Sequence, residues 1–188
     1  LVIGAFGHFV GHKGAVYVYR TSDGGATYPQ VAKLTAGDGA SYDFFGISVA
    51  IDGNTIVIGA YGDDDAGSMS GSASVFHTSD GGATYSQVAK LTASNAASND
   101  YFGWSVAIDS ETVVVGCLHE AALYVFHTSD GGATYDEVPK LTASDGASGF
   151  GRAVAIDGDT LVVSAWPWSN FGGTGWGSST WSADAGSN

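Results

Sequence analysis

The sequence is poor in positive charge, in cysteine and in long apolar runs. Its 188 residues include six lysines and arginines against 19 aspartates and glutamates, which gives a formal net charge of −13. So acidic a chain does not suit nucleic acid or an anionic membrane, because both require basic side chains at the contact. Cys117 is the only cysteine, so no internal disulfide can form, and we expect it to be a small buried packing residue. No run is long enough to predict membrane insertion.

What the sequence does contain is an internal repeat. Three strings recur in the same order: Thr-Ser-Asp-Gly-Gly-Ala-Thr-Tyr at 21–28, 78–85 and 128–135, Lys-Leu-Thr-Ala at 33–36, 90–93 and 140–143, and Phe-Gly at 45–46, 102–103 and 150–151. Copies of the first string start 57 and then 50 residues apart. A period of this length is typical of propellers, solenoids and arrays, whose units bury their apolar faces against one another.

Each unit predicts four β-strands and no helix. Short apolar runs rich in Val and Ile and bounded by Gly, Asp and Asn are typical of strands. In the second unit they lie at 48–51, 55–59, 72–77 and 85–91. Four antiparallel strands per repeat are typical of a β-propeller blade. A right-handed β-solenoid fits less well, because its coils are shorter and its strands are parallel.

We therefore predict an all-β chain that forms an incomplete β-propeller of four-stranded antiparallel blades. The expected units are a partial blade with strands two to four at 1–44, full blades at 45–101 and 102–149, a partial blade with strands one and two at 150–165, and a divergent tail at 166–188. The remaining blades would come from a longer chain or from a second copy. The tail, rich in Trp, Gly and Ser, is either an aromatic sugar-binding loop or a disordered end.

The strings Phe-Gly, Ser-Val-Ala-Ile-Asp and Ile-Val-Ile-Gly-Ala at 45–60 resemble the FG-GAP repeat. The segments 102–117 and 150–165 resemble it too, the last with Ser164 in place of the glycine. This family builds the propeller of integrin α subunits and of many secreted or surface proteins. The resemblance implies an extracellular or cell-surface propeller with a role in adhesion or recognition, and it implies no catalysis.

Calcium-binding members of that family carry an Asp-rich loop between the first two strands. Here the link is only Asp52-Gly53-Asn54 and its counterparts, which cannot supply the roughly six to eight oxygens that calcium takes. We therefore expect no cofactor at these links. Three adjacent carboxylates, Asp63, Asp64 and Asp65, either help to hold a calcium ion or form a solvated acidic loop.

The string at 21–28 is also similar to the Asp box, a fold-stabilising turn in sialidases and other propellers. We expect its Asp to accept backbone N–H bonds, its second Gly to permit the turn, and Tyr28 to pack against the blade. In the three copies the structural turn residues are Asp23, Gly25, Thr27, Asp80, Gly82, Thr84, Asp130, Gly132 and Thr134.

The residue that follows each Phe-Gly changes from copy to copy: it is Ile47, Trp104 or Arg152. A changing position between fixed neighbours predicts a blade end that faces solvent, and Trp and Arg are common in binding hot spots. The alternative is packing between adjacent blades. The Phe residues themselves, Phe45, Phe102 and Phe150, are predicted to be core wedges between blades.

These features favour a non-enzymatic extracellular scaffold that binds a protein or a glycan. The alternative is a fragment of a carbohydrate-active, sialidase-like propeller enzyme that lacks its catalytic blades. A sialidase site needs a cluster of arginines, whereas this chain has only Arg20 and Arg152, in strands that are not equivalent. No nucleophile elbow, phosphate loop or zinc-spaced His/Cys set is present.

Overall fold

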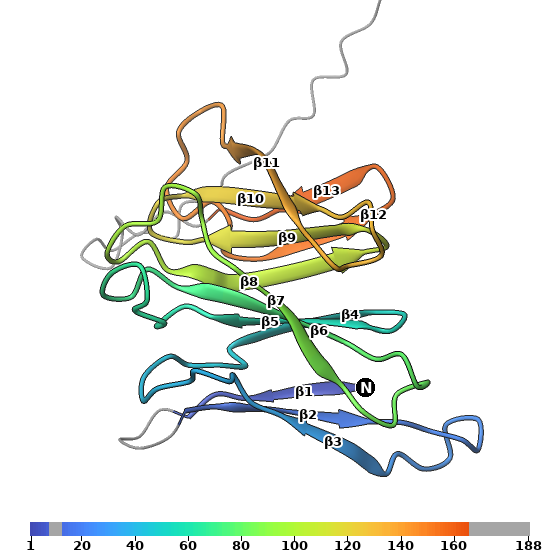
Figure 1. Ribbon diagram of the computed structural model, residues 1–188. Coiled ribbons are helices and arrows are strands. Elements are labelled where there is room, and N and C mark those ends of the chain that lie inside the picture. The colour runs from blue at the N-terminus through green and yellow to red at the C-terminus, as the bar shows by residue number, and fades with distance from the viewer. Residues whose placement is uncertain (8–12, 166–188) are drawn as a thin grey trace, which may run out of the picture.

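The computed structural model describes residues 1–7 and 13–165, in which strands are the only regular element. The strands form four antiparallel sheets in chain order, stacked one on the next (Figure 1). The first sheet contains β1 (Val2–Ala5), β2 (Ala15–Tyr19) and β3 (Gln30–Leu34). The predicted tail at 166–188 lies outside the described residues.

The two central sheets have four strands each. The second contains β4 (Ser48–Asp52), β5 (Thr55–Ala60), β6 (Ser72–His77) and β7 (Ser86–Leu91). The third contains β8 (Phe102–Asp109), β9 (Thr112–Cys117), β10 (Ala122–His127) and β11 (Asp136–Thr142). The fourth sheet pairs β12 (Val154–Asp157) with β13 (Thr160–Val163). Strands adjacent in sequence are adjacent in each sheet, so the all-β prediction of an incomplete propeller is confirmed, and the sheets do not close into a ring.

The core lies between the sheets rather than inside any one of them. Side chains alternate between the two faces of a strand, so Ile56 and Ile58 join the cluster shared with the first sheet, while Val57 joins the cluster shared with the third. All three are 0% exposed. Burying each such side chain stabilises the stack by about 1.5–3 kcal/mol. No sheet could bury both of its faces alone.

The predicted phenylalanine wedges lie at these junctions. Phe45 and Phe102 are 0% exposed and belong to the first and second inter-sheet clusters. Phe150 packs against the third cluster, between the third and fourth sheets, but it is only partly buried. The expectation therefore holds fully for two of the three residues.

Because successive strands run in opposite directions, the connections alternate between two rims of the stack (Figure 1). The loop rim, on the left in Figure 1, carries the connections 61–71 and 118–121 and the approaches to β4 and β8. The hairpin rim, on the right, carries the turns within β4–β5, β8–β9 and β12–β13 and the three Asp-Gly-Gly turns. The candidate site lies on the loop rim.

Candidate functional site

An aromatic strip crosses the loop rim from the second sheet to the third. Its six ring side chains are Tyr42, Phe44, Tyr61, Trp104, Tyr101 and His119. Tyr61 is the centre: its ring centroid lies 4.8 Å from that of Phe44, 4.9 Å from Trp104 and 5.6 Å from Tyr101. Such spacings give attraction between rings beyond their area of burial. Four connections and the start of strand β8 are therefore joined into one aromatic surface.

The strip has a buried base and an open edge. Phe44 is 6% exposed, Tyr61, Tyr101 and Trp104 are half-buried, and Tyr42 is 44% exposed. Burial raises the pKa of the Tyr61 hydroxyl, and the neighbouring Tyr101 adds to this effect. The phenol is therefore neutral at pH 7. The strip can offer ring faces and hydroxyl hydrogen bonds to a ligand.

The backbone under the strip is held in an uncommon conformation. Tyr42, Phe44 and Tyr101 have φ values of 75°, 58° and 58°, in the left-handed region, where each bulky residue costs about 1–3 kcal/mol. The connection 61–71 holds this geometry: Gly62 N–H donates to Asp43 O at 3.0 Å, and Tyr101 N–H donates to Met69 O at 3.1 Å. Strain of this kind concentrates at functional sites.

A lysine–carboxylate cluster lies beneath the same rim. Lys90 Nζ lies 2.7 Å from Asp38 Oδ2, 2.8 Å from Asp63 Oδ2 and 2.5 Å from Asp65 Oδ2. Asp63 is 5% exposed and also accepts a bond from Ser72 Oγ at 2.8 Å. Partial burial opposes the charged form, but the three carboxylates outweigh it and raise the pKa of Lys90. Of the triplet weighed for calcium, Asp63 and Asp65 thus share the Lys90 ammonium with Asp38, while Asp64 is exposed.

The third sheet has a counterpart of this cluster, in which Lys140 pairs with Glu120. Glu120 Oε2 lies 2.5 Å from the Tyr124 hydroxyl. The potential ligand atoms of Asp100, Cys117 and Glu120 lie within 4.8 Å of one another. However, burial first, and then the nearby Glu120 and Asp100 charges, raise the pKa of the Cys117 thiol. The thiol is therefore neutral, and Cys117 at 0% exposure is the buried residue expected, while Glu120 is already bound by Lys140, Asn95 and Tyr124.

The hairpins at which related propellers bind calcium do not fit that ion here. Asp52 Oδ2 accepts the Ser110 N–H at 2.7 Å, and Asp109 Oδ2 accepts the Gly158 N–H at 2.5 Å. Each carboxylate therefore ties its hairpin to the next hairpin along the stack. Each two-residue turn thus offers one carboxylate, which already accepts a backbone hydrogen bond. Calcium needs about six to eight oxygen ligands, so these turns cannot supply its coordination sphere.

The three Asp-Gly-Gly turns form the hydrogen bonds expected of them. Asp80 Oδ1 accepts the N–H groups of Ala83 and Thr84, each at 2.9 Å, and Asp80 Oδ2 accepts the Thr84 hydroxyl at 2.6 Å. Asp23 and Asp130 accept the equivalent threonine bonds. These bonds, with the threonine hydroxyl foremost, lower the pKa of all three carboxyls well below the usual range. The second glycine of each turn has a φ between 90° and 96°.

The tyrosines that end the turns differ in packing. Tyr85 and Tyr135 pack against the inter-sheet clusters. Tyr28 is 48% exposed, so the expectation that it packs against its blade is wrong. Its face of the first sheet is not covered by another sheet among the described residues.

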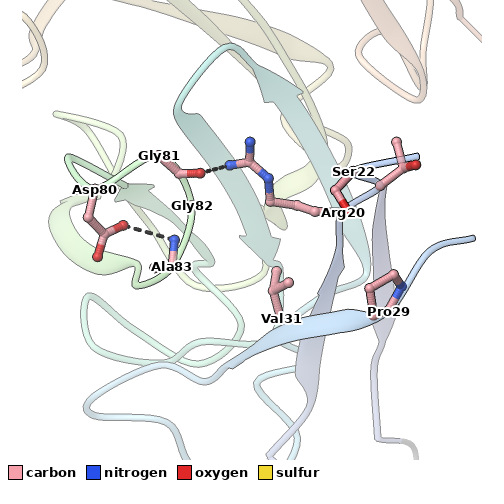
Figure 2. Close-up of a pocket in the computed structure, with 9 residues that line it drawn as sticks. Arg20, Ser22, Pro29, Val31, Asp80, Gly81, Gly82 and Ala83 are labelled. Carbon is pink, nitrogen blue, oxygen red and sulfur yellow. Dashed lines mark hydrogen bonds between the residues drawn. The ribbon is translucent and has the colours of Figure 1, made fainter. Parts of the chain in front are cut away.

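A cleft of about 340 Å³ separates the first two of these turns. Figure 2 shows Arg20 reaching from the end of β2 toward the neighbouring turn, where its guanidinium donates to the Gly81 carbonyl. Arg20 and Asp80 are the charged residues of its lining. Arg20 and Asp80 already form hydrogen bonds with the backbone of the second turn. We therefore interpret the cleft as a contact region between neighbouring turns and not as a ligand site.

The structure treats the three predicted ligand-face residues differently. Trp104 packs on Tyr61 and joins the strip, Ile47 is half-buried at the start of the second sheet, and Arg152 is exposed beside the fourth. The other strip residues, Tyr42, Phe44, Tyr61, Tyr101 and His119, were not predicted as ligand contacts from the sequence. A signal was present, because an aromatic residue precedes Phe45-Gly46 and Phe102-Gly103 alike.

Stacked antiparallel sheets with a Phe-Gly wedge at each junction define an open β-propeller. The FG-GAP repeat family model matches residues 28–76, 85–136 and 135–179, which together exceed half of the chain. The chain therefore belongs to the FG-GAP repeat family. No curated protein sequence matches it significantly. Within the described ranges, no helix has the length and apolar character to cross a bilayer.

Proposed function

We propose that this protein is a non-enzymatic binding or adhesion scaffold of the extracellular space or cell surface, and that its ligand meets the aromatic strip. The observation that carries the proposal is the strip itself, where strained backbone gathers rings from four connections and from β8. Family membership supports the location, because FG-GAP repeats are typical of secreted and surface proteins.

The chemistry of the strip supports a protein or glycan ligand. Aromatic residues dominate the contacts that contribute most to protein interfaces, and flat rings with a polar tip suit a surface that must contact both apolar and hydroxylated groups. The connection that begins with Tyr61 also carries the exposed carboxylates of Asp64 and Asp65. These carboxylates can accept hydrogen bonds from sugar hydroxyls or from basic peptide side chains.

The test compares two tyrosines of similar exposure on opposite rims. Tyr42 is 44% exposed on the loop rim, and Tyr28 is 48% exposed beside a turn of the hairpin rim. The purified chain is applied to an immobilised panel of glycans and of extracellular matrix proteins. We expect at least one panel member to bind, and we expect Tyr42→Ser to weaken its affinity about tenfold while Tyr28→Ser leaves it unchanged. Equal effects of the two substitutions, or no binding partner at all, would refute the proposal.

The second candidate function is a fragment of a carbohydrate-active propeller enzyme. The Asp-box-like turns favour it, because sialidases carry similar turns. Incubation with fluorogenic sialosides and neutral glycosides distinguishes the two candidates, since a scaffold releases no fluorophore above the rate of the buffer. Turnover that survives further purification would favour the enzyme.

A further inference from the structure

Each junction between sheets brings a backbone carbonyl against a glycine. The carbonyl oxygens of Gly46, Gly103 and Gly151, the glycines of the three Phe-Gly pairs, lie against Gly4, Gly59 and Gly116 of the preceding sheet. A Cβ added at any of the latter three would lie less than 3.0 Å from that oxygen. None of these three positions has positive φ. Glycine is required there because the next sheet approaches closely, and not because of the local backbone conformation.

A serine hydroxyl binds the same carbonyl oxygen. Ser48 Oγ donates to Gly103 O at 2.9 Å, and Ser105 Oγ donates to Gly151 O at 2.7 Å. Within each sheet the serine and the glycine are direct cross-strand partners, Ser48 with Gly59 and Ser105 with Gly116. The Ser–Gly pair thus forms a binding site for the carbonyl of the next sheet. The serine hydroxyl donates a hydrogen bond to the carbonyl oxygen, and the glycine has no Cβ that would clash with it.

The fourth sheet lacks both features. Ala153 occupies the serine position and Ser164 the glycine position. The Ser164 hydroxyl accepts the Ala153 N–H at 3.0 Å, so it bonds within its own sheet. Its Cβ occupies the space that the next carbonyl would need. No sheet follows the fourth among the described residues, so Val162 on this face is 63% exposed, whereas its equivalents Val57 and Val114 are 0% exposed beneath a following sheet.

A second glycine position also differs at the junction between the third and fourth sheets. Gly14 and Gly71 form parallel bridges with Phe45 and Phe102 of the next sheet. The third sheet carries Ala121 at this position, and no bridge joins it to Phe150 among the described residues. Phe150 is also the wedge that is only partly buried.

We propose that the glycine that receives the carbonyl, reinforced by the serine hydroxyl in the second and third sheets, determines which sheet face accepts a further FG-GAP blade, since the first sheet receives the second at Gly4 with no paired serine among the described residues. The faces of the second and third sheets, with Ser48–Gly59 and Ser105–Gly116, accept one. The face of the fourth sheet, with Ala153–Ser164, does not accept a Phe-Gly blade in this register. The inference concerns assembly of the fold and is independent of the proposed ligand.

The test transfers the fourth-sheet pair to the third sheet of the full chain. Ser105→Ala/Gly116→Ser should release the fourth sheet, so amide hydrogens in β12 and β13 should exchange about tenfold faster or more. Those in β4 and β5, which lie away from the altered junction, should keep their protection. Gly116→Ala, which adds one methyl group, should act in the same direction. Gly37→Ser is the matched control, because a Cβ at Gly37 has its nearest neighbour at 3.8 Å.

Two results would overturn the proposal. If the double variant keeps wild-type protection in β12 and β13, an Ala–Ser pair receives the carbonyl as well as a Ser–Gly pair does. If protection in β4 and β5 falls equally, the pair acts on the whole fold and does not select the junction.

Discussion

At the scale of single residues, the loop rim accommodates two buried carboxyl groups in different ways. Asp63 is matched by the Lys90 ammonium, whereas Asp43, 6% exposed, relies on the Ala40 N–H at 2.6 Å. Burial, reinforced by Asp63 and Asp64, raises the pKa of the Asp43 carboxyl. A raised carboxyl pKa favours the neutral form in the fold, so this residue's contribution to stability declines as pH rises through that pKa.

Lys90→Met should destabilise the protein because it leaves the buried Asp63 carboxylate without its partner. We expect a loss of about 2 kcal/mol in the free energy of unfolding, measured by urea denaturation. The matched control is Lys33→Met, at the equivalent position of the first sheet, where Lys33 Nζ lies 5.7 Å from the centroid of the Tyr17 ring. That contact is worth only about 0.5–1 kcal/mol. Equal losses in the two variants would contradict our account of the cluster.

Asp80→Asn should lower the Tm at pH 7, because an amide is a weaker acceptor for the Thr84 hydroxyl and backbone bonds. The folded pKa of Asp80 lies below its ordinary value of 3.8. The stability it contributes is therefore present above that value and is lost as pH falls below it. Thermal melts at pH 7 and in acid should show a smaller acid-induced drop for the variant than for the wild type. Asp64→Asn, in an exposed loop, should leave both the Tm and its pH profile close to wild type.

At the scale of elements, the carboxylates of the β4–β5 and β8–β9 hairpins connect successive sheets. Asp109→Ala removes the bond to Gly158 N–H, and we expect a loss of about 1 kcal/mol. Asp157→Ala alters the equivalent residue of the fourth sheet, for which no following hairpin is present among the described residues. Its effect should stay within about 0.5 kcal/mol. Chemical denaturation measures both, and a larger loss for Asp157→Ala would contradict this role.

The strands were predictable because their signal is local. The run Thr55 to Gly59 has the apolar character of a buried strand, and the structure extends it by one residue, to Ala60. The aromatic strip was not predictable in the same way, because Phe44, Tyr61 and Tyr101 come from separate connections and meet only through positive φ values at Phe44 and Tyr101. The pairing of Lys90 with Asp38 also depends on stacking, since 52 residues separate them.

At the scale of the whole molecule, we expect that the protein does not need calcium for stability, although its net charge is −13. The carboxylates best placed to bind an ion already bind Lys90, Lys140 or hairpin N–H groups. We therefore expect the same Tm, within about 1 °C, in millimolar calcium and in excess chelator at fixed ionic strength. Differential scanning calorimetry would measure it. A rise of several degrees that calcium produces and magnesium does not would contradict this expectation.

The two faces of the second and third sheets are unlike, since one carries the Phe wedge and the other the glycine that receives the next sheet. Contacts of this kind are head-to-tail, so the stack has a polarity. Two copies joined through such faces could not form an isologous dimer about a two-fold axis. Any association by this route would close into a cyclic assembly or grow as a helical filament, depending on the rotation between successive sheets.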